Sequence, residues 1–332
     1  MEKHIQFTKP NGEVITKHIR AKDEAELNRK IDLIQSELNK APLLSKMIDE
    51  WQQYHDEEIN YNTQQCYIAP IKNIKEYFKG KHIDEIQPLE IDIFLKKLYN
   101  DYRWSKQTIK LRLMVLNQVF NYAIIQGYIK TNPCFAIKVT SKAKSTKREL
   151  PKQSCIDVVK QSVKDEFGLY PFLLIYTGCR RCEALALTYN DINRNNKTIQ
   201  INKTVIFQNG KPTIQMHTKS TAGDRIVPLL PPLEEALNPK GKGYIFNIDN
   251  EPICQSRFIR LWDNYRKNHN IELTPHQLRH AYATILYEAG IQVKDAQALL
   301  GHASAEITQE IYTHISENQQ NKTFNQLINF VK

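Results

Sequence analysis

Six side chains in the second half of the sequence could together carry out chemistry on a phosphodiester. Two are arginines, whose planar guanidinium groups bind phosphate oxygens through paired hydrogen bonds and stay charged at any working pH. The others are a lysine, two histidines and a tyrosine, which are the residue types that serve as general acid, general base and nucleophile. The six are Arg180, Lys219, His276, Arg279, His302 and Tyr312.

This set of residues suits phosphoryl transfer without a metal ion or another cofactor. The two arginines would supply the positive charge that Mg²⁺ provides in many such reactions. Tyr312 would be the nucleophile, His276 its base, and Lys219 the acid that protonates the departing oxygen. Two-metal nucleases need several carboxylates, whereas the only acid within the two arginine motifs is Glu183. We therefore expect Glu183 to position an arginine.

Other motifs for metals or cofactors give weaker predictions. Cys179 and Cys182 form a CxxC motif, but no second CxxC accompanies it, so two half-buried side chains on a helix explain it better than a redox or zinc site. His276 and His280 have the spacing of a zinc peptidase, but Gln277 stands where the catalytic glutamate is required. Neither a GxxxxGK[ST] nor a GxGxxG motif occurs, so nothing predicts a nucleotide cofactor.

The composition predicts a globular protein with a polyanionic partner. The chain has 332 residues, enough for two domains and a small extra module, and its 41% hydrophobic content excludes wholesale disorder. No stretch reaches the ~20 apolar residues that a membrane span needs, and the start lacks a secretory leader. We expect a cytoplasmic protein, with its six cysteines reduced. The net charge of +10 favours binding to nucleic acid.

Hydrophobic periodicity and turn signals divide the chain into five parts. Strands over 4–8 and 14–19 flank Asn11-Gly12, and a helix over 22–39 follows. Helices are predicted from 44 to about 51, over 61–78, 88–99 and 105–125, and later over 152–164, 167–176, 180–187, 254–268, 275–289, 292–299, 306–313 and 319–330. Strands are predicted over 198–207, 213–218 and 225–229. The parts are a module at 1–40, a helical domain at 43–140, a linker at 141–150, a mixed domain at 151–314 and a tail at 315–332.

The linker is strongly basic. It holds four basic residues and one acidic residue, lacks apolar periodicity and is followed by Pro151. Because it joins two folded domains, we expect its basic side chains to contact a DNA backbone. These side chains are Lys142, Lys144, Lys147 and Arg148.

The sequence over about 43–314 resembles the tyrosine recombinases, in particular integrases of phages and integrative elements. Phe120-Asn-Tyr-Ala123, Gly127 and Asn132-Pro133 are similar to the end of that family's helical core-binding domain. Five further motifs occur in the family's order: Thr177-Gly178-Cys179-Arg180 with Glu183, Thr218-Lys219 followed by Arg225-Ile-Val-Pro-Leu229, Pro275-His276-Gln-Leu-Arg279-His280, Leu300-Gly301-His302 with Ser304, and Ile311-Tyr312-Thr313-His314.

The resemblance implies a mainly α fold with a small β-sheet, in which a helical core-binding domain precedes a mixed α+β catalytic domain. It implies that Tyr312 attacks a phosphate in double-stranded attachment-site DNA, forms a 3′-phosphotyrosyl bond and conserves the bond energy, so that neither ATP nor a metal is needed. His280 would support the catalytic set. It further implies a homo-tetramer on DNA in which the tail, with its stripe of Phe324, Leu327, Ile328 and Phe330, docks on a neighbour. The module at 1–40 resembles an arm-type DNA-binding module.

Three alternatives to a mobile-element integrase stay open. A chromosome-dimer resolvase would use the same strand exchange, although such proteins usually lack an N-terminal module like residues 1–40. A type IB topoisomerase would act as a monomer without a partner site. A non-catalytic DNA-binding regulator would not need to keep a nucleophile. The sequence does not decide whether a directionality factor or a host DNA-bending protein takes part.

Overall fold

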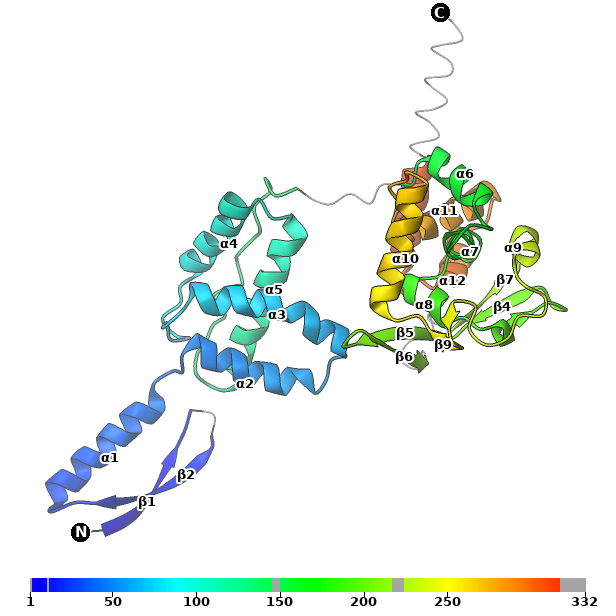
Figure 1. The fold of residues 1–332 in the computed structure, drawn as a ribbon. Coiled ribbons are helices and arrows are strands. Elements are labelled where there is room, and N and C mark those ends of the chain that lie inside the picture. Colours follow the sequence, from blue (N-terminus) through cyan, green and yellow to red (C-terminus); the bar gives the residue numbers. More distant parts are fainter. Residues whose placement is uncertain (1, 11, 145–149, 217–223, 317–332) are drawn as a thin grey trace, which may run out of the picture. The chain divides into compact units, whose positions relative to one another are not determined.

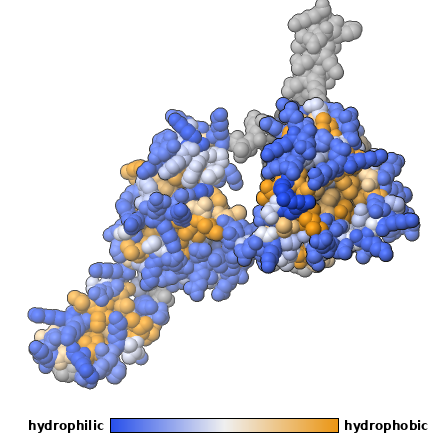
Figure 2. Space-filling view, viewed as in Figure 1, coloured by the Kyte–Doolittle hydropathy of each residue, from blue (hydrophilic) through white to orange (hydrophobic). Residues whose placement is uncertain are grey.

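The computed structural model describes residues 2–10, 12–144, 150–216 and 224–316. The chain divides into two compact units, residues 1–147 and residues 148–332 (Figure 1). Most of the face visible in Figure 2 is hydrophilic in both units. No helix in these described ranges is long and apolar enough to cross a bilayer. Lys147, Arg148, Lys219 and the helix predicted over 319–330 lie outside the described residues.

The first unit begins with the predicted hairpin and helix. Strands β1 (Glu2–Thr8) and β2 (Val14–Arg20) pair antiparallel. Helix α1 (Glu24–Asn39) begins at Asp23, whose carboxylate accepts a hydrogen bond from the Glu26 amide at 2.7 Å. Phe7, Ile19 and Leu27 form a small hydrophobic cluster between hairpin and helix.

Four helices make up the rest of the first unit, as predicted: α2 (Leu44–Asp56), α3 (Tyr61–Tyr77), α4 (Pro88–Tyr102) and α5 (Lys106–Ile125). Helix α5 packs against the other three and buries Leu116 and Phe120 among them. The predicted linker at 141–150 is not exposed throughout. Ala143 is buried in the helical core, because the Lys106 amide at the start of α5 donates to the Lys144 carbonyl at 3.1 Å. Lys142 and Lys144 themselves are exposed.

The second unit is built around α7 (Leu169–Thr177), which lies among α6 (Gln153–Gln161), α8 (Arg181–Ala186) and α11 (Pro275–Glu288) (Figure 1). The sequence of α7 is apolar on every side, and its residues 170–175 are buried. The remaining helices are α9 (Pro231–Ala236), α10 (Gln255–Asn268), α12 (Val293–Leu300) and a helix over 305–316.

The strands of the second unit correct one prediction. The single strand predicted over 198–207 is two strands, β4 (Thr198–Ile201) and β5 (Lys203–Gln208). The alternation of buried residues continues in step across the break, so the sequence carries no signal for it, and Lys203 forms an ion pair with Asp191 instead of joining the core.

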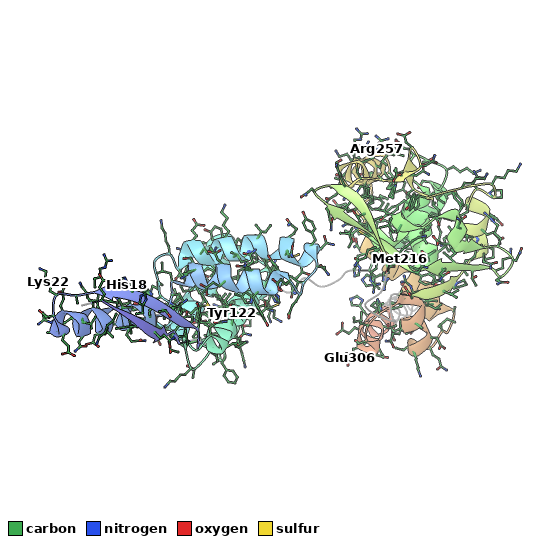
Figure 3. All side chains as sticks on the ribbon, turned by 90° about the horizontal axis from the view of Figure 1, so that it is seen from below. His18, Lys22, Tyr122, Met216, Arg257 and Glu306 are labelled. Atoms are coloured by element: carbon green, nitrogen blue, oxygen red, sulfur yellow. The ribbon has the colours of Figure 1, made fainter. Side chains whose placement is uncertain are left out.

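The two strands pair with different partners. Strand β4 lies between β3 (Ile192–Asn193) and β7 (Arg225–Pro228), whereas β5 pairs with β6 (Lys211–Met216). Strand β6 ends at Met216, which is labelled between Arg257 and Glu306 in the view of Figure 3. A short 3₁₀ turn (Tyr189–Asp191) and a small hairpin of β8 (Asn247–Ile248) and β9 (Glu251–Pro252) complete the unit. The predicted class, mainly α with small β-sheets, is confirmed.

Candidate active site

Arg180 is positioned by a sharp turn between α7 and α8. Helix α7 ends at Gly178, whose φ of +62° lies in the left-handed region that favours glycine. A Cβ atom at this position would lie 2.4 Å from the Tyr282 ring, so only glycine fits. The chain then turns so that Arg180 precedes the first residue of α8. The Glu183 carboxylate accepts a hydrogen bond from the Arg180 amide at 2.8 Å and thereby caps this helix.

Arg279 is positioned by the start of α11. Thr274 and Gln277 form a reciprocal capping box there, and Pro275 occupies the first turn. Gln277, which stands where a zinc peptidase has its glutamate, therefore has a structural role. Arg279 lies one turn further along and is only 3% exposed. Its Nη1 donates to the Gly178 carbonyl at 2.8 Å, which ties α11 to the turn that carries Arg180.

The carboxyl end of α12 holds three arginines at once. Helix α12 ends at Gly301, again in the left-handed region, and its last carbonyls have no partner within the helix. Three consecutive carbonyls each accept a hydrogen bond from a different guanidinium group: Leu299 from Arg225 Nε at 2.9 Å, Leu300 from Arg279 Nη2 at 2.5 Å, and Gly301 from Arg180 Nη2 at 2.5 Å. The negative end of the helix dipole thus faces the positive cluster.

Glu183 is the carboxylate of this cluster. It accepts hydrogen bonds from Arg180 Nη1 at 2.6 Å and from Arg225 Nη2 at 2.8 Å, and it is 1% exposed. Burial alone would raise its pKa, but the charges and hydrogen bonds of Arg225 and Arg180 hold the pKa at about 2. Glu183 thus contacts two arginines, and its positioning role stays a prediction.

The arginine cluster is electropositive. Burial would lower the pKa of Arg225, but the Glu183 carboxylate raises it above the ordinary value. Burial and the neighbouring charges of Arg180 and Arg225 lower the pKa of Arg279 to about 9, so it is still charged at neutral pH. Three guanidinium groups face one carboxylate within the described residues. The Arg180 side chain, 47% exposed, opens this excess positive charge to an anion from solvent.

His302 follows α12 directly and is 8% exposed. Its Nδ1 lies 2.9 Å from Oγ1 of Thr308, a fully buried residue on the helix over 305–316. Burial and the charges of Arg279 and Arg180 lower the pKa of His302 to about 3, so the ring is neutral at physiological pH. On α11, the rings of exposed His276 and buried His280 lie 4.5 Å apart, edge to face.

Tyr312 lies in an apolar cluster. The residue is 7% exposed, packs with Tyr282 and Leu286, and meets the Tyr287 ring edge to face at 5.1 Å. Among the described residues, its buried hydroxyl has no hydrogen-bond partner, and burial raises the pKa of the phenol. The expected convergence of all six side chains stays a prediction, since Lys219 lies outside the described residues. Arg180, Arg279 and His302 come together at the end of α12, whereas no hydrogen bond joins Tyr312 to them.

Arg225 is the residue that sequence reasoning missed. The sequence pattern marks it only as the start of a strand after the lysine motif. A signal was available, since Arg225 and Val227 on β7 and Leu229 just after it alternate with exposed residues and are all buried. An arginine in step with two core residues needs acceptors for its buried donors, and the Glu183 carboxylate and the Leu299 carbonyl are those acceptors.

No group of three or more His, Cys, Asp or Glu side chains in the described ranges could hold a metal ion. Cys182 is half-buried at the start of α8, whereas Cys179 is fully buried in the turn before that helix, so the prediction of two half-buried cysteines on a helix is correct only for Cys182. In the linker, only Lys142 and Lys144 of the four expected DNA contacts are described.

Comparisons with known proteins identify the family. Residues 156–319 match the phage integrase family, and residues 43–128 match the phage integrase N-terminal SAM-like domain. A tyrosine recombinase XerC-like protein of Caldanaerobacter subterraneus subsp. tengcongensis is 32% identical over 292 residues, covering 76% of this chain and 73% of that protein. The ICEBs1 integrase of Bacillus subtilis is 26% identical over 293 residues, covering 82% of this chain and 78% of its own.

Two solved structures share the fold. The integrase of the Tn1549 transposon, in complex with transposon right end DNA, has a TM-score of 0.69 at 19% identity, over 85% of this chain and 99% of the other. A lambda integrase dimer bound to a core site has a TM-score of 0.63 at 20% identity, over 93% and 92%. With these matches and the arginine motifs in place, the chain belongs to the tyrosine recombinase family of site-specific recombinases.

Proposed function

We propose that this protein is the integrase of a mobile element, which cuts and rejoins double-stranded DNA at attachment sites through a 3′-phosphotyrosyl bond to Tyr312. One observation carries the proposal: three guanidinium groups are fixed by the end of α12 beside a neutral His302, and the helix that follows bears Tyr312. Arg180 and Arg279 of this cluster can stabilise the charge that develops on a phosphate oxygen in the transition state, because their guanidinium groups are oriented before the substrate arrives.

The proposed roles extend the expectations drawn from the sequence. Arg180, half-exposed, and Arg279 would bind the non-bridging oxygens, while His276 would accept the phenol proton and Lys219 would protonate the departing 5′-oxygen. His302 would donate or accept through its second ring nitrogen, and His280 would support His276 from within the unit. Tyr312 must leave its apolar cluster before it can attack, since its hydroxyl is buried there. The partner strand's 5′-hydroxyl would then attack the phosphotyrosyl bond and release the enzyme.

The relatives support a mobile element and assembly on DNA. The names of similar proteins include the integrase of the ICEBs1 element and the integrase of the Tn1549 transposon, and a lambda integrase tetramer has been solved on a Holliday junction. We propose that this chain also acts as a homo-tetramer in the bacterial cytoplasm, with the tail from 315 docking on a neighbouring protomer. A directionality factor or a host DNA-bending protein would set the balance between integration and excision. The four basic residues of the linker would contact the DNA backbone.

Chromosome-dimer resolution is the second candidate, because several relatives are named XerC or XerD. The hairpin and helix at the start of the first unit favour the integrase, since an arm-type module suits binding to additional sites. We expect an integrase to recombine two attachment sites of its element and not two chromosomal dimer sites.

The test is a covalent trap on DNA from the chain's own genomic neighbourhood. Nicked suicide substrates should yield a protein–DNA adduct with the unmodified protein, and sequencing its junctions would identify the site. Tyr312→Phe should bind the same DNA and form no adduct, whereas Tyr287→Phe, which changes the neighbouring ring, should still form it. EDTA should leave the adduct yield unchanged. An adduct formed by Tyr312→Phe would refute the assignment of the nucleophile, and loss of cleavage in EDTA would indicate a metal-dependent reaction.

A further inference from the structure

Arg225 makes contacts that none of the proposed catalytic roles uses. Its Nε donates to the Leu299 carbonyl at the end of α12, and its Nη2 donates to Glu183 at the start of α8. We infer that Arg225 is a positioning residue for DNA cleavage, an inference that rests on the proposed function. Arg225 fixes the Glu183 carboxylate against Arg180 and joins β7 to the end of α12.

The geometry divides the Glu183 carboxylate between two arginines. Its Oε1 accepts from Arg180 Nη1 at 2.6 Å. Its Oε2 accepts from Arg225 Nη2 at 2.8 Å and from the Arg180 amide, also at 2.8 Å. The orientation of Arg180 therefore depends on a carboxylate whose other oxygen is held by Arg225. A displacement of Glu183 would move the Arg180 guanidinium relative to a bound phosphate.

Burial separates the roles of the two arginines. The side chains of Arg225 and Glu183 are 4% and 1% exposed, whereas that of Arg180 is 47% exposed. Arg225 is enclosed by protein and acts on the substrate only through Glu183. Its planar fork donates to a carbonyl and a carboxylate at the same time, which the single ammonium group of a lysine cannot reproduce in the same geometry.

The charges around Glu183 come from three elements. Arg180 precedes α8, Arg225 begins β7 and Arg279 lies on α11, while the Cys179 thiol, the Tyr282 phenol and the His302 ring also interact with these arginines. Without Arg225, the buried carboxyl loses the charge that lowers its pKa most, and it binds a proton more readily. A protonated Glu183 no longer attracts Arg180 as an ion. Cleavage by such a variant should therefore acquire a dependence on pH that the unmodified protein lacks.

The test compares three variants with the unmodified protein in single-turnover cleavage of the suicide substrate, from about pH 5 to about pH 9, with DNA affinity measured in parallel. Arg225→Met should cleave on the order of 10²-fold more slowly, as expected for a small misplacement of a catalytic group. Its rate should fall further towards acid pH while its affinity for DNA is kept. Arg225→Lys keeps the charge and should restore part of the rate at neutral pH. Arg225→Met combined with Glu183→Gln should be slow but lack the new acid dependence.

Each result separates this inference from the proposed function. Failure of the unmodified protein to form any adduct overturns the proposed function, and with it the basis for this role. An unmodified protein that cleaves while Arg225→Met cleaves at the same rate, with the same pH profile, overturns the inference alone. If Arg225→Met does not fold, the combined variant, which removes both the Arg225 cation and the Glu183 carboxylate, decides the question. Wild-type cleavage by that combined variant overturns the role of the Arg225–Glu183–Arg180 chain.

Discussion

The hydroxyl of the candidate nucleophile should cost the resting protein stability. Tyr312 packs its ring among apolar side chains, but its phenol oxygen is buried and has no hydrogen-bond partner among the described residues. A buried polar group in this state costs about 1–3 kcal/mol relative to its hydrated form. Tyr312→Phe removes the oxygen and keeps the ring with its edge-to-face contact to Tyr287. We therefore expect the substitution to stabilise the protein.

The expected gain can be measured by thermal or urea unfolding of the uncomplexed protein. A gain of about 1–2 kcal/mol in the free energy of unfolding corresponds to a rise in Tm of roughly 2–8 °C for a unit of this size. The matched control is Tyr265→Phe, because the Tyr265 hydroxyl does have a partner, Ser162 Oγ at 2.6 Å. This substitution should lower the free energy of unfolding by about 0.5–1.5 kcal/mol. The same chemical change should thus have opposite signs at the two positions.

A Tyr312→Phe protein that is less stable than the unmodified one, or equal to it, would refute the reasoning. It would mean that the phenol oxygen has a hydrogen-bond partner in the resting state, or that the ring spends its time outside the apolar cluster. Confirmation would have a consequence for catalysis. The cost of the unpaired hydroxyl, about 1–3 kcal/mol, would favour movement of Tyr312 towards the arginines. Burial of its ring would oppose that movement.

Three further predictions concern the surroundings of the site. Thr308→Val should keep the fold but slow cleavage, because it removes the hydroxyl that lies 2.9 Å from His302 Nδ1 and frees the ring to rotate; an unchanged single-turnover rate would argue against this role. The pKa of His302 is lowered from 6.5 to about 3. As the pH is lowered, the unfolded chain therefore takes up a proton at this histidine before the folded protein does, and the free energy of unfolding should fall below about pH 6.5. Urea unfolding at about pH 7.5 and about pH 5 should therefore show a smaller loss of stability for His302→Gln than for the unmodified protein, and equal losses would contradict the buried, neutral ring. We expect weaker salt dependence of DNA binding when the basic residues of 141–150 are changed together to alanine. The slope of log K for DNA binding against log salt concentration should fall by about 0.9 for each phosphate that the linker neutralises, and an unchanged slope would show that the linker does not touch DNA. The residues changed are Lys142, Lys144, Lys147 and Arg148.

The helices could be predicted from the sequence because each buries one face and ends at a recognisable signal. Helix α5 covers nearly the range expected for it, with Ser105 as its N-cap and Gly127 shortly after its end. The shorter pieces were not predicted. Helix α9 and the two-residue strands β8 and β9 are too short to show a period, and contacts made elsewhere in the fold decide their conformation. The break between β4 and β5 is of the same kind.

The motifs indicated which side chains matter, but not how they are held. Residue types and spacing predicted the two arginines and His302, which the fold brings to the end of α12. They could not predict the retracted position of Tyr312. The same residue types allow both a buried and an engaged tyrosine.

The means by which the arginines are oriented explains why Arg225 was missed. The groups that hold the three guanidinium groups are main-chain carbonyls at residues 299–301, together with one carboxylate. A carbonyl is present at every position, so sequence motifs cannot mark these acceptors. The sequence specifies only the conditions that expose them, chiefly the left-handed Gly301 that ends α12 and leaves its last carbonyls without partners inside the helix. An arginine that binds to such backbone groups is recognised when the fold shows which helix end it faces. Its bond to a carboxylate that also holds another arginine then indicates a positioning role.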